Sequence, residues 1–201
     1  MAVVVVGGHS RNIGKTSVVA ALIARLPELR WTAFKITQYG HGFCTADGKP
    51  CQCQTEDSCV SITAERDATS GTDTSRFLAA GAVRSLWVRT RVGMLAESMP
   101  RIRQELAASE NAILESNSVL EFLEPDLYLV VVDPSVDDWK DSARRFFSRA
   151  DAVLLCGNSG ASALTIPAET PRFRIAAPNY ISGEAVEFVR SRIAREARLS
   201  R

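Results

Sequence analysis

The sequence of 201 residues lacks the features that mark several broad classes of protein. No apolar run approaches the roughly 20 residues that a helix needs to span a bilayer. Neither sign of charge dominates, because 24 Lys and Arg residues are balanced by 23 Asp and Glu residues, which leaves a net charge of +1. Such a balance gives no general attraction to nucleic acid or to an anionic membrane surface. We therefore expect neither as a partner.

The chain also has no internal repeat, no low-complexity segment and no basic stretch ahead of its first apolar run. Residues 3–6 therefore predict a strand rather than a signal peptide, and we expect a cytoplasmic protein. Apolar residues make up 46% and charged residues 23%, which is ordinary for a globular protein with its own core. We expect a single domain over residues 1–201. Disulfides are rare in the cytoplasm, so the five cysteines need another explanation.

Short apolar runs alternate with helical stretches along the chain, which predicts an α/β fold with a mostly parallel sheet. Residues 3–6 form a continuous β-branched run, as in a strand that is buried on both faces. The expected strands are residues 3–6, 31–36, 85–89, 111–114, 127–132, 152–155 and 172–176. The expected helices are residues 15–25, 74–80, 94–108, 142–148 and 184–197, the third of them kinked or broken at Pro100.

The strongest chemical signal is the segment Gly-His-Ser-Arg-Asn-Ile-Gly-Lys-Thr, from Gly8 to Thr16, between the first strand and the first helix. This is the context that a phosphate-binding loop requires. Backbone N–H groups of such a loop bind phosphate oxygens, Lys15 adds a cation at the β- and γ-phosphates, and the Thr16 hydroxyl can ligate Mg²⁺. The expected nucleotide-binding residues are Gly8, Asn12, Ile13, Gly14, Lys15, Thr16 and Ser17. The loop fits ATP and GTP equally.

Two carboxylates are candidates for completing the magnesium site. Glu115 follows the expected strand 111–114, and a carboxylate at the carboxyl end of a strand beside the loop can hold Mg²⁺ or its water. Asp73 precedes the expected helix 74–80, where it can reach the nucleotide or cap the helix. Thr16 and Glu115 are therefore the expected Mg²⁺ ligands.

Two polar residues in the second half of the chain are weaker candidates. Asn158 follows the expected strand 152–155 and can either bind the edge of the nucleotide base or simply form a turn. Lys140 precedes the expected helix 142–148 and is interpreted as a solvated charge rather than a substrate contact. Neither residue distinguishes adenine from guanine.

Four cysteines gather within residues 37–71, a segment without periodicity that is unusually long for a structureless loop. They are Cys44, Cys51, Cys53 and Cys59, with His41 just upstream. Four thiolates suit tetrahedral Zn²⁺, and a bound metal would order such a segment. An iron–sulfur cluster, a redox dithiol and chance clustering are the alternatives. We expect residues 37–71 to be an inserted metal-binding loop, with Zn²⁺ as the first choice and His41 as an optional ligand.

The spacing Gly8-x5-Gly14-Lys15-Thr16 resembles that of the dethiobiotin synthetase and cobyric acid synthase branch of P-loop proteins. The segment Ala-Phe-Lys-Ile around Lys35 is similar to the second motif of that branch, a Phe-Lys pair at the end of strand two. This resemblance implies that Lys35 faces the active site as a second cation near the phosphates. A surface lysine at a strand end is the alternative.

A second resemblance covers more of the chain, about residues 3 to 130. Residues 71–82, Gly-Thr-Asp-Thr-Ser-Arg-Phe-Leu-Ala-Ala-Gly-Ala, are similar to the Gly-Lys-Asp-Ser/Thr-x-Arg…Ala-Gly-Ala signature of the molybdopterin-guanine dinucleotide biosynthesis protein B family. A Glu-Gly-Phe-Lys motif follows in that family, and Glu115 matches its acidic residue. Ser116 replaces the glycine, the lysine is missing, and the Cys-rich segment replaces a His-rich one.

Together these resemblances imply a three-layer α/β P-loop NTPase that binds Mg-GTP or Mg-ATP and hydrolyses it slowly. They also imply a homodimer that acts with a partner protein as an adaptor in molybdenum-cofactor (guanine dinucleotide) biosynthesis. Lys15, Lys35, Asp73 and Glu115 are the residues expected to act on the phosphates or the metal. Two alternatives stay open: an ATP-dependent ligase of dethiobiotin synthetase type, and a metal chaperone or sensor that nucleotide switches.

Overall fold

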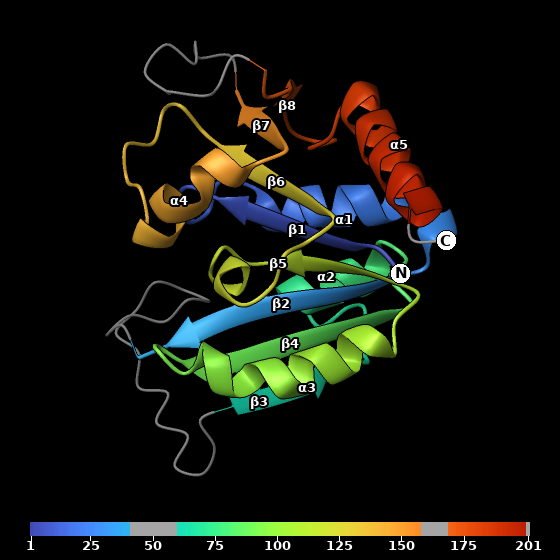
Figure 1. Cartoon of the computed structure of the whole chain (residues 1–201), viewed down its shortest axis with the longest axis vertical. Helices are drawn as coiled ribbons and strands as arrows, with labels where there is room; N and C mark the ends of the chain where they lie inside the picture. Colours follow the sequence, from blue (N-terminus) through green and yellow to red (C-terminus); the bar gives the residue numbers. More distant parts are fainter. Residues whose placement is uncertain (41–59, 158–168, 200–201) are drawn as a thin grey trace.

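The computed structural model describes residues 1–40, 60–157 and 169–199 (Figure 1). Several sites predicted from the sequence lie outside these residues, and their roles stay predictions. They are His41, Cys44, Cys51, Cys53, Cys59 and Asn158. None of the helices in the described ranges is long and apolar enough to cross a membrane.

An eight-stranded sheet forms the centre of the molecule, in the order β3-β4-β2-β5-β1-β6-β7-β8. Neighbouring strands are parallel, except that the edge strand β3 is antiparallel to β4. The strands are β1 (Val3–Gly8), β2 (Trp31–Tyr39), β3 (Val60–Ala64), β4 (Arg84–Arg91), β5 (Asn111–Glu115), β6 (Leu127–Val132), β7 (Ala152–Cys156) and β8 (Arg172–Ile175). The predicted α/β fold with a mostly parallel sheet is confirmed.

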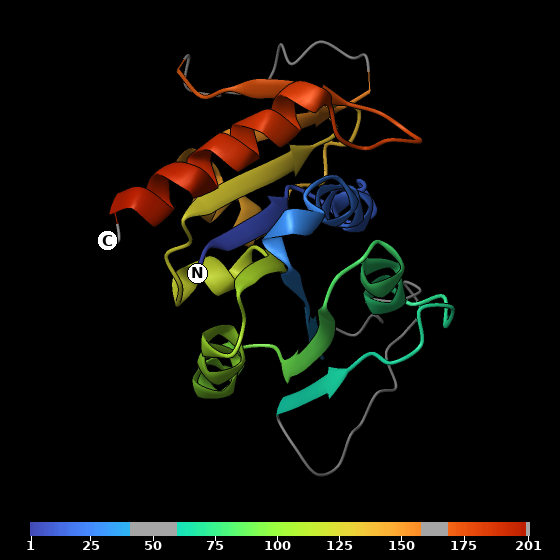
Figure 2. The ribbon, with the colours of Figure 1, turned by 90° about the vertical axis from the view of Figure 1, so that its right-hand side faces the viewer.

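Helices cover both faces of the sheet, which gives three layers (Figure 2). One face packs against α1 (Lys15–Arg25), α2 (Asp73–Ala79) and α5 (Gly183–Leu199). The other face packs against α3 (Leu95–Ala107) and α4 (Asp141–Phe146). Two cores result, and β1 contributes to both because its successive side chains point to opposite faces.

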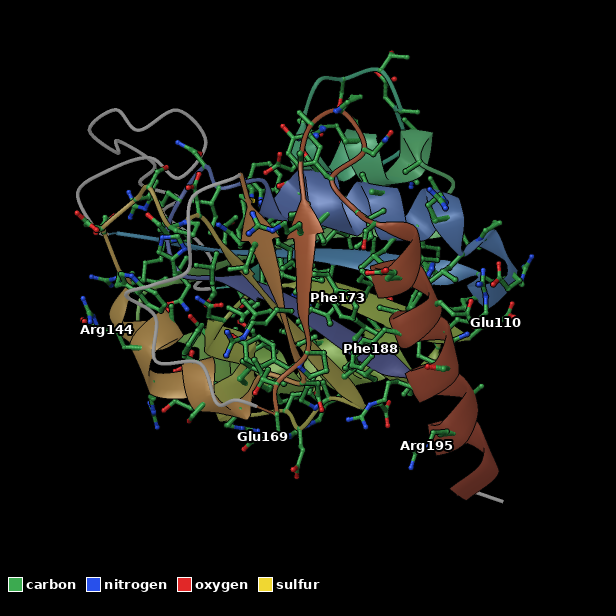
Figure 3. The ribbon with its side chains drawn as sticks, turned by 90° about the horizontal axis from the view of Figure 1, so that it is seen from above. Glu110, Arg144, Glu169, Phe173, Phe188 and Arg195 are labelled. Carbon is green, nitrogen blue, oxygen red and sulfur yellow. The ribbon has the colours of Figure 1, made fainter. Side chains whose placement is uncertain are left out.

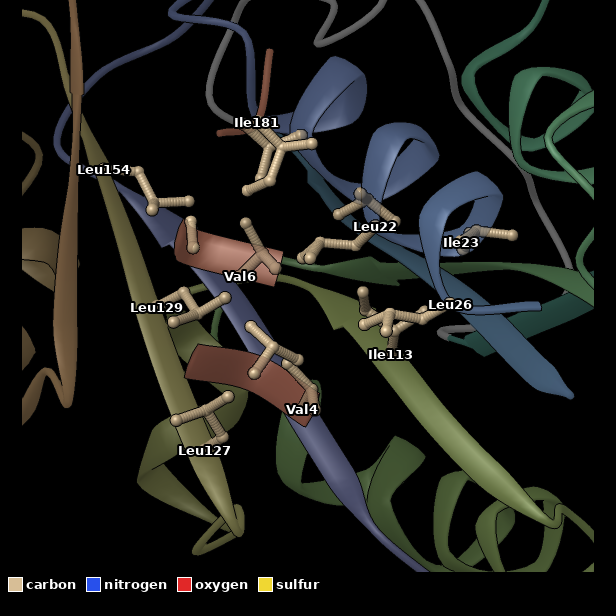
Figure 4. Packing of buried hydrophobic residues seen from close by; sticks show 14 of the residues in the cluster. Val4, Val6, Leu22, Ile23, Leu26, Ile113, Leu127, Leu129, Leu154 and Ile181 are labelled. Atoms are coloured by element: carbon tan, nitrogen blue, oxygen red, sulfur yellow. The ribbon is translucent and has the colours of Figure 1, made fainter. Parts of the chain in front are cut away.

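The apolar pattern of β1 and the helices accounts for this arrangement. Val4 and Val6 lie in the core under α1, together with Leu22 (Figure 4). Val3 and Val5 lie in the core under α3. The residues of α3 that face the sheet recur at helical spacing; they are Leu95, Met99, Ile102 and Leu106. At the far edge, Phe173 of β8 and Phe188 of α5 pack with ring centroids 5.4 Å apart (Figure 3).

Two sequence predictions about local structure differ from what is observed. Helix α3 is not broken at Pro100, which lies in its second turn, and Met99 and Ile102 on either side are buried against the sheet. Two parts of segment 37–71, predicted as an irregular loop, are strand: β2 continues to Tyr39, and β3 spans Val60–Ala64. The sequence of β3 does not predict a strand, because it has no apolar run. Pairing with β4 holds β3 in place.

Candidate nucleotide-binding site

The predicted phosphate-binding loop lies between β1 and α1, as the sequence indicates. Gly14 caps α1 with a φ of 90°, in the left-handed region that favours glycine. A Cβ atom there would also lie 3.1 Å from a ring carbon of Tyr180. At Gly8 a Cβ atom would lie 2.7 Å from Cδ of Lys15. A side chain at Gly8 would displace Lys15, and one at Gly14 would strain the backbone and press on Tyr180.

Asn117 holds the start of this loop, a role that the sequence did not reveal. Strand β5 ends beside Val6 of β1, so Gly8 has no strand partner on that side. The Asn117 side chain takes the place of the strand: its Oδ1 accepts from the Gly8 N–H, and its Nδ2 donates to the Gly8 carbonyl, both at 2.8 Å. Asn117 is buried, so these hydrogen bonds are shielded from water.

Replacing Asn117 with alanine should lower the free energy of unfolding by about 2–4 kcal/mol, since the buried N–H and carbonyl of Gly8 both lose their partner. Urea unfolding followed by circular dichroism measures this change. Asn179→Ala is the matched control, because Asn179 is exposed and its loss should change stability by less than ~0.5 kcal/mol. Equal stabilities of the two variants would contradict this role of Asn117.

Beside the loop, the carboxyl end of β5, the middle of β2 and the first turns of α1 and α2 bring together polar residues that are far apart in the sequence. Glu115 is buried, and its Oε2 accepts a hydrogen bond from Thr16 Oγ1 at 2.8 Å. Its Oε1 lies 2.6 Å from Lys35 Nζ. Lys35 Nζ also lies 2.6 Å from Asp73 Oδ2 and 3.2 Å from Thr16 Oγ1. All four were singled out from the sequence as candidate site residues.

Lys35 stays charged in this cluster. Burial lowers the pKa of its ammonium group, but the neighbouring Glu115 and Asp73 carboxylates more than offset it, so the net pKa is raised. Asp73 is free to pair with Lys35 because the cap of α2 is Thr72, whose hydroxyl accepts from the Ser75 N–H at 3.1 Å. Asp73 therefore does not cap α2, and its role at the nucleotide site stays a prediction.

The donor set of this cluster fits Mg²⁺. The Thr16 hydroxyl and the Glu115 carboxylate supply hard oxygen atoms, and Mg²⁺ is usually held by one or two carboxylates together with substrate phosphates. A metal bound there would neutralise charge on those phosphates. Among the described residues, no group of three or more His, Cys, Asp or Glu side chains could hold a metal ion. The predicted zinc site has no support from this part of the chain.

Lys15 and Lys140 add positive charge at the loop, close to each other and to Glu115. Lys15 Nζ donates to the Ser10 carbonyl at 2.6 Å, and burial, assisted by the positive charge of Lys140, lowers the pKa of Lys15 to about 8. Burial and the neighbouring Arg11 lower the pKa of Lys140 as well. Lys140 was interpreted from the sequence as a solvated charge. Its backbone N–H donates to the His9 carbonyl at 2.9 Å, and the residue is half-buried beside the loop.

Three other residues of the loop and the start of α1 are held by contacts within the protein. His9 is fully buried, its Nε2 lies 2.9 Å from the Val136 carbonyl, and its ring packs on Trp139. The Ser17 hydroxyl accepts a hydrogen bond from Arg76 of α2 at 2.8 Å, so this predicted nucleotide contact is engaged within the protein. Ile13 is buried and its carbonyl accepts from the Cys156 thiol, whose pKa is raised to about 11 by burial.

Comparison with known proteins finds similarity in structure but not in sequence. No protein-family model and no curated protein matches the chain. Among solved structures, HypB from Helicobacter pylori, in complex with nickel, has a TM-score of 0.51 at 15% identity and covers 98% of this chain and 87% of its own. LpxK from Aquifex aeolicus, in complex with ATP, has a TM-score of 0.49 at 18% identity and covers 87% of this chain and 53% of its own.

MobB from Bacillus subtilis is also among the similar structures, with a TM-score of 0.44 at 16% identity, and covers 96% of this chain and 97% of its own. The similarity to HypB shows that the two chains share a three-layer α/β fold.

Proposed function

We propose that this protein binds a Mg-nucleoside triphosphate, ATP or GTP, and hydrolyses it slowly. The observation that carries the proposal is the convergence of Lys15, Thr16, Lys35 and Glu115 around one loop. Phosphoryl transfer depends mainly on positioning the reactants and on neutralising their negative charge. Lys15 supplies one cation, Thr16 and Glu115 supply ligands for the metal, and Lys35 supplies a second cation. In hydrolysis, water forms a bond to the γ-phosphorus while the bond to the β,γ-bridging oxygen breaks.

Binding is tested by titrating a fluorescent triphosphate analogue with and without Mg²⁺ and then displacing it with ATP or GTP. Release of inorganic phosphate measures turnover. We expect displacement by unlabelled triphosphate and turnover that requires Mg²⁺. Failure of the analogue to bind at millimolar concentrations would overturn the proposal, and the order of displacement would identify the preferred base.

The biological role that the motifs favour is that of an adaptor in molybdenum-cofactor (guanine dinucleotide) biosynthesis, acting in the cytoplasm as a homodimer with a partner protein. The signature over residues 71–82 supports it, and Asp73 of that signature reaches the cluster through Lys35. A ligase of dethiobiotin synthetase type is the second candidate, favoured by the position of Lys35 beside Thr16. Stimulation of turnover by a carboxylic acid substrate would select the ligase.

The Cys-rich segment carries a separate proposal, that it binds Zn²⁺ in a structural or sensing role. Elemental analysis and an absorbance spectrum of anaerobically purified protein test it. About one zinc per chain without visible absorption is the expected result for a four-thiolate site. Iron and sulfide in a brown protein would replace zinc with an iron–sulfur cluster. Cys51→Ser should lose the metal and keep nucleotide binding if the two sites are independent.

A further inference from the structure

A polar region of the sheet beside the nucleotide site has no part in the function proposed above. The parallel pairing of β2 and β4 sets Lys35 opposite Trp87 and Thr37 opposite Arg89. Side chains two residues apart on a strand share a face, so all four lie on one face of the sheet. It is the face of α2, because the Ser85 hydroxyl, next in this series on β4, donates to the Thr74 carbonyl of that helix.

The side chains of Trp87 and Arg89 are held together on this face. Trp87 Nε1 donates to Thr37 Oγ1 at 2.8 Å, which fixes the indole between β4 and β2. The guanidinium carbon of Arg89 lies 4.8 Å from the centroid of the Trp87 rings, within reach of a cation–π interaction. A guanidinium held in this way loses little further freedom when it binds a ligand.

Arg89 lacks the partners that such a side chain normally has. Its Nε is buried and finds no hydrogen-bond acceptor within the residues that the structure describes. Across the described ranges, no carboxylate forms an ion pair with Arg89. Lys35, by contrast, has the carboxylates of Asp73 and Glu115 each at 2.6 Å. A buried N–H without a partner is costly, and an incoming acceptor would remove that cost.

We infer that Arg89, positioned by Trp87 and Thr37, binds the oxyanion of a second small-molecule ligand, a carboxylate or a phosphate, beside the bound nucleotide. The planar fork of a guanidinium suits both groups, since each offers two oxygen atoms to parallel N–H donors. A small anion fits this site better than a polyanion, because the chain has a net charge of only +1 and the residues around Arg89 lie on a single pair of strands, β2 and β4.

The position of Arg89 suits a second substrate. It lies one strand away from Lys35 and two residues further toward the carboxyl end of the sheet. From the strand spacing and rise, the two Cα atoms are about 8 Å apart, which side chains of this length can bridge. A ligand anchored at Arg89 would therefore extend toward the phosphate end of a nucleotide. A carboxylate or phosphate bound there would be the second substrate of the proposed nucleotide-dependent reaction, so this role of Arg89 rests on the proposed function.

Tryptophan fluorescence tests the inference, with inorganic phosphate and acetate as separate probes at constant ionic strength. The protein is first saturated with Mg²⁺ and a non-hydrolysable triphosphate so that the loop is filled. We expect one probe to change the emission saturably in the millimolar range, and Arg89→Gln to weaken that binding by about tenfold or more. Trp87→Phe should remove the signal. Whichever probe binds identifies the oxyanion as phosphate or carboxylate.

Arg101→Gln is the matched control, because Arg101 is exposed on α3, across the sheet from Arg89, and its loss should leave probe affinity unchanged. Equal affinity in the wild type and Arg89→Gln would overturn the inference, as would no saturable binding of either probe. Circular dichroism verifies that each variant is folded, and Arg89→Lys, which keeps charge without the fork, should bind more weakly than the wild type. If no triphosphate binds, the proposed function fails. Titration of Lys15→Ala with phosphate and acetate in the absence of nucleotide then still shows whether Arg89 binds an oxyanion.

Discussion

Lys15→Ala should weaken binding of a Mg-nucleoside triphosphate by about 100-fold or more, which corresponds to ~2.7 kcal/mol or more. Lys15 is the cation inside the loop, and its Nζ lies 2.6 Å from the Ser10 carbonyl, where the loop folds over it. No other described side chain occupies that position, so alanine leaves the phosphates without their closest positive charge. Equilibrium titration with the fluorescent analogue measures the loss.

The fold should survive this substitution. The Lys15 pKa of about 8 lies below its ordinary value of 10.5, so folding disfavours the charged form of this side chain. Below pH 8, its removal therefore relieves an electrostatic cost, and the thermal midpoint should not fall. Asn117 continues to hold Gly8 in the variant. Affinity equal to that of the wild type would contradict the assignment of the loop.

Arg25→Ala provides the comparison at the opposite end of the same helix. Arg25 is exposed in the last turn of α1, away from the loop, and carries the same charge as Lys15. Its loss should leave triphosphate affinity within about twofold of the wild type, because exposed charges more than a Debye length from the phosphates are screened. A comparable loss in both variants would mean that net charge rather than the loop drives binding.

The parts of the fold that local pattern determines could be predicted from the sequence. The β-branched run of β1, the helical spacing in α3 and the glycines of the loop each depend on neighbours in the chain. Strand β3 escaped prediction because it is short and half-polar, and its stability comes from pairing with β4. Such pairing depends on topology, which local pattern does not encode.

The same distinction applies to the site. Lys15 and Thr16 are recognisable from their motif, whereas Lys35 was identified through a family resemblance, and only strand order places it beside Glu115. Asn117 and Lys140 could not be predicted, because their contacts with Gly8 and His9 cross more than 100 residues of sequence. The pair of Trp87 and Arg89 likewise depends on the register between β2 and β4.

Glu115→Gln should reduce Mg²⁺-dependent hydrolysis by about 100-fold while leaving nucleotide binding without Mg²⁺ largely intact. Glutamine keeps the shape of the side chain, and its amide oxygen can still accept from the Thr16 hydroxyl. The negative charge is lost, however, and with it the carboxylate that suits the metal. Phosphate release at increasing Mg²⁺ concentrations measures the rate and the metal requirement together.

The comparison with and without Mg²⁺ separates two roles that Glu115 combines. Its Oε1 pairs with Lys35, so glutamine also leaves that ammonium with Asp73 as its one carboxylate within the described residues. Because Asp73 still pairs with Lys35, metal-free nucleotide binding should change little, whereas loss of a metal ligand raises the Mg²⁺ concentration needed for turnover. Glu121→Gln, at an exposed position after β5, should change neither. An unchanged Mg²⁺ requirement in Glu115→Gln would place the metal elsewhere and leave Glu115 as the partner that holds Lys35 in position.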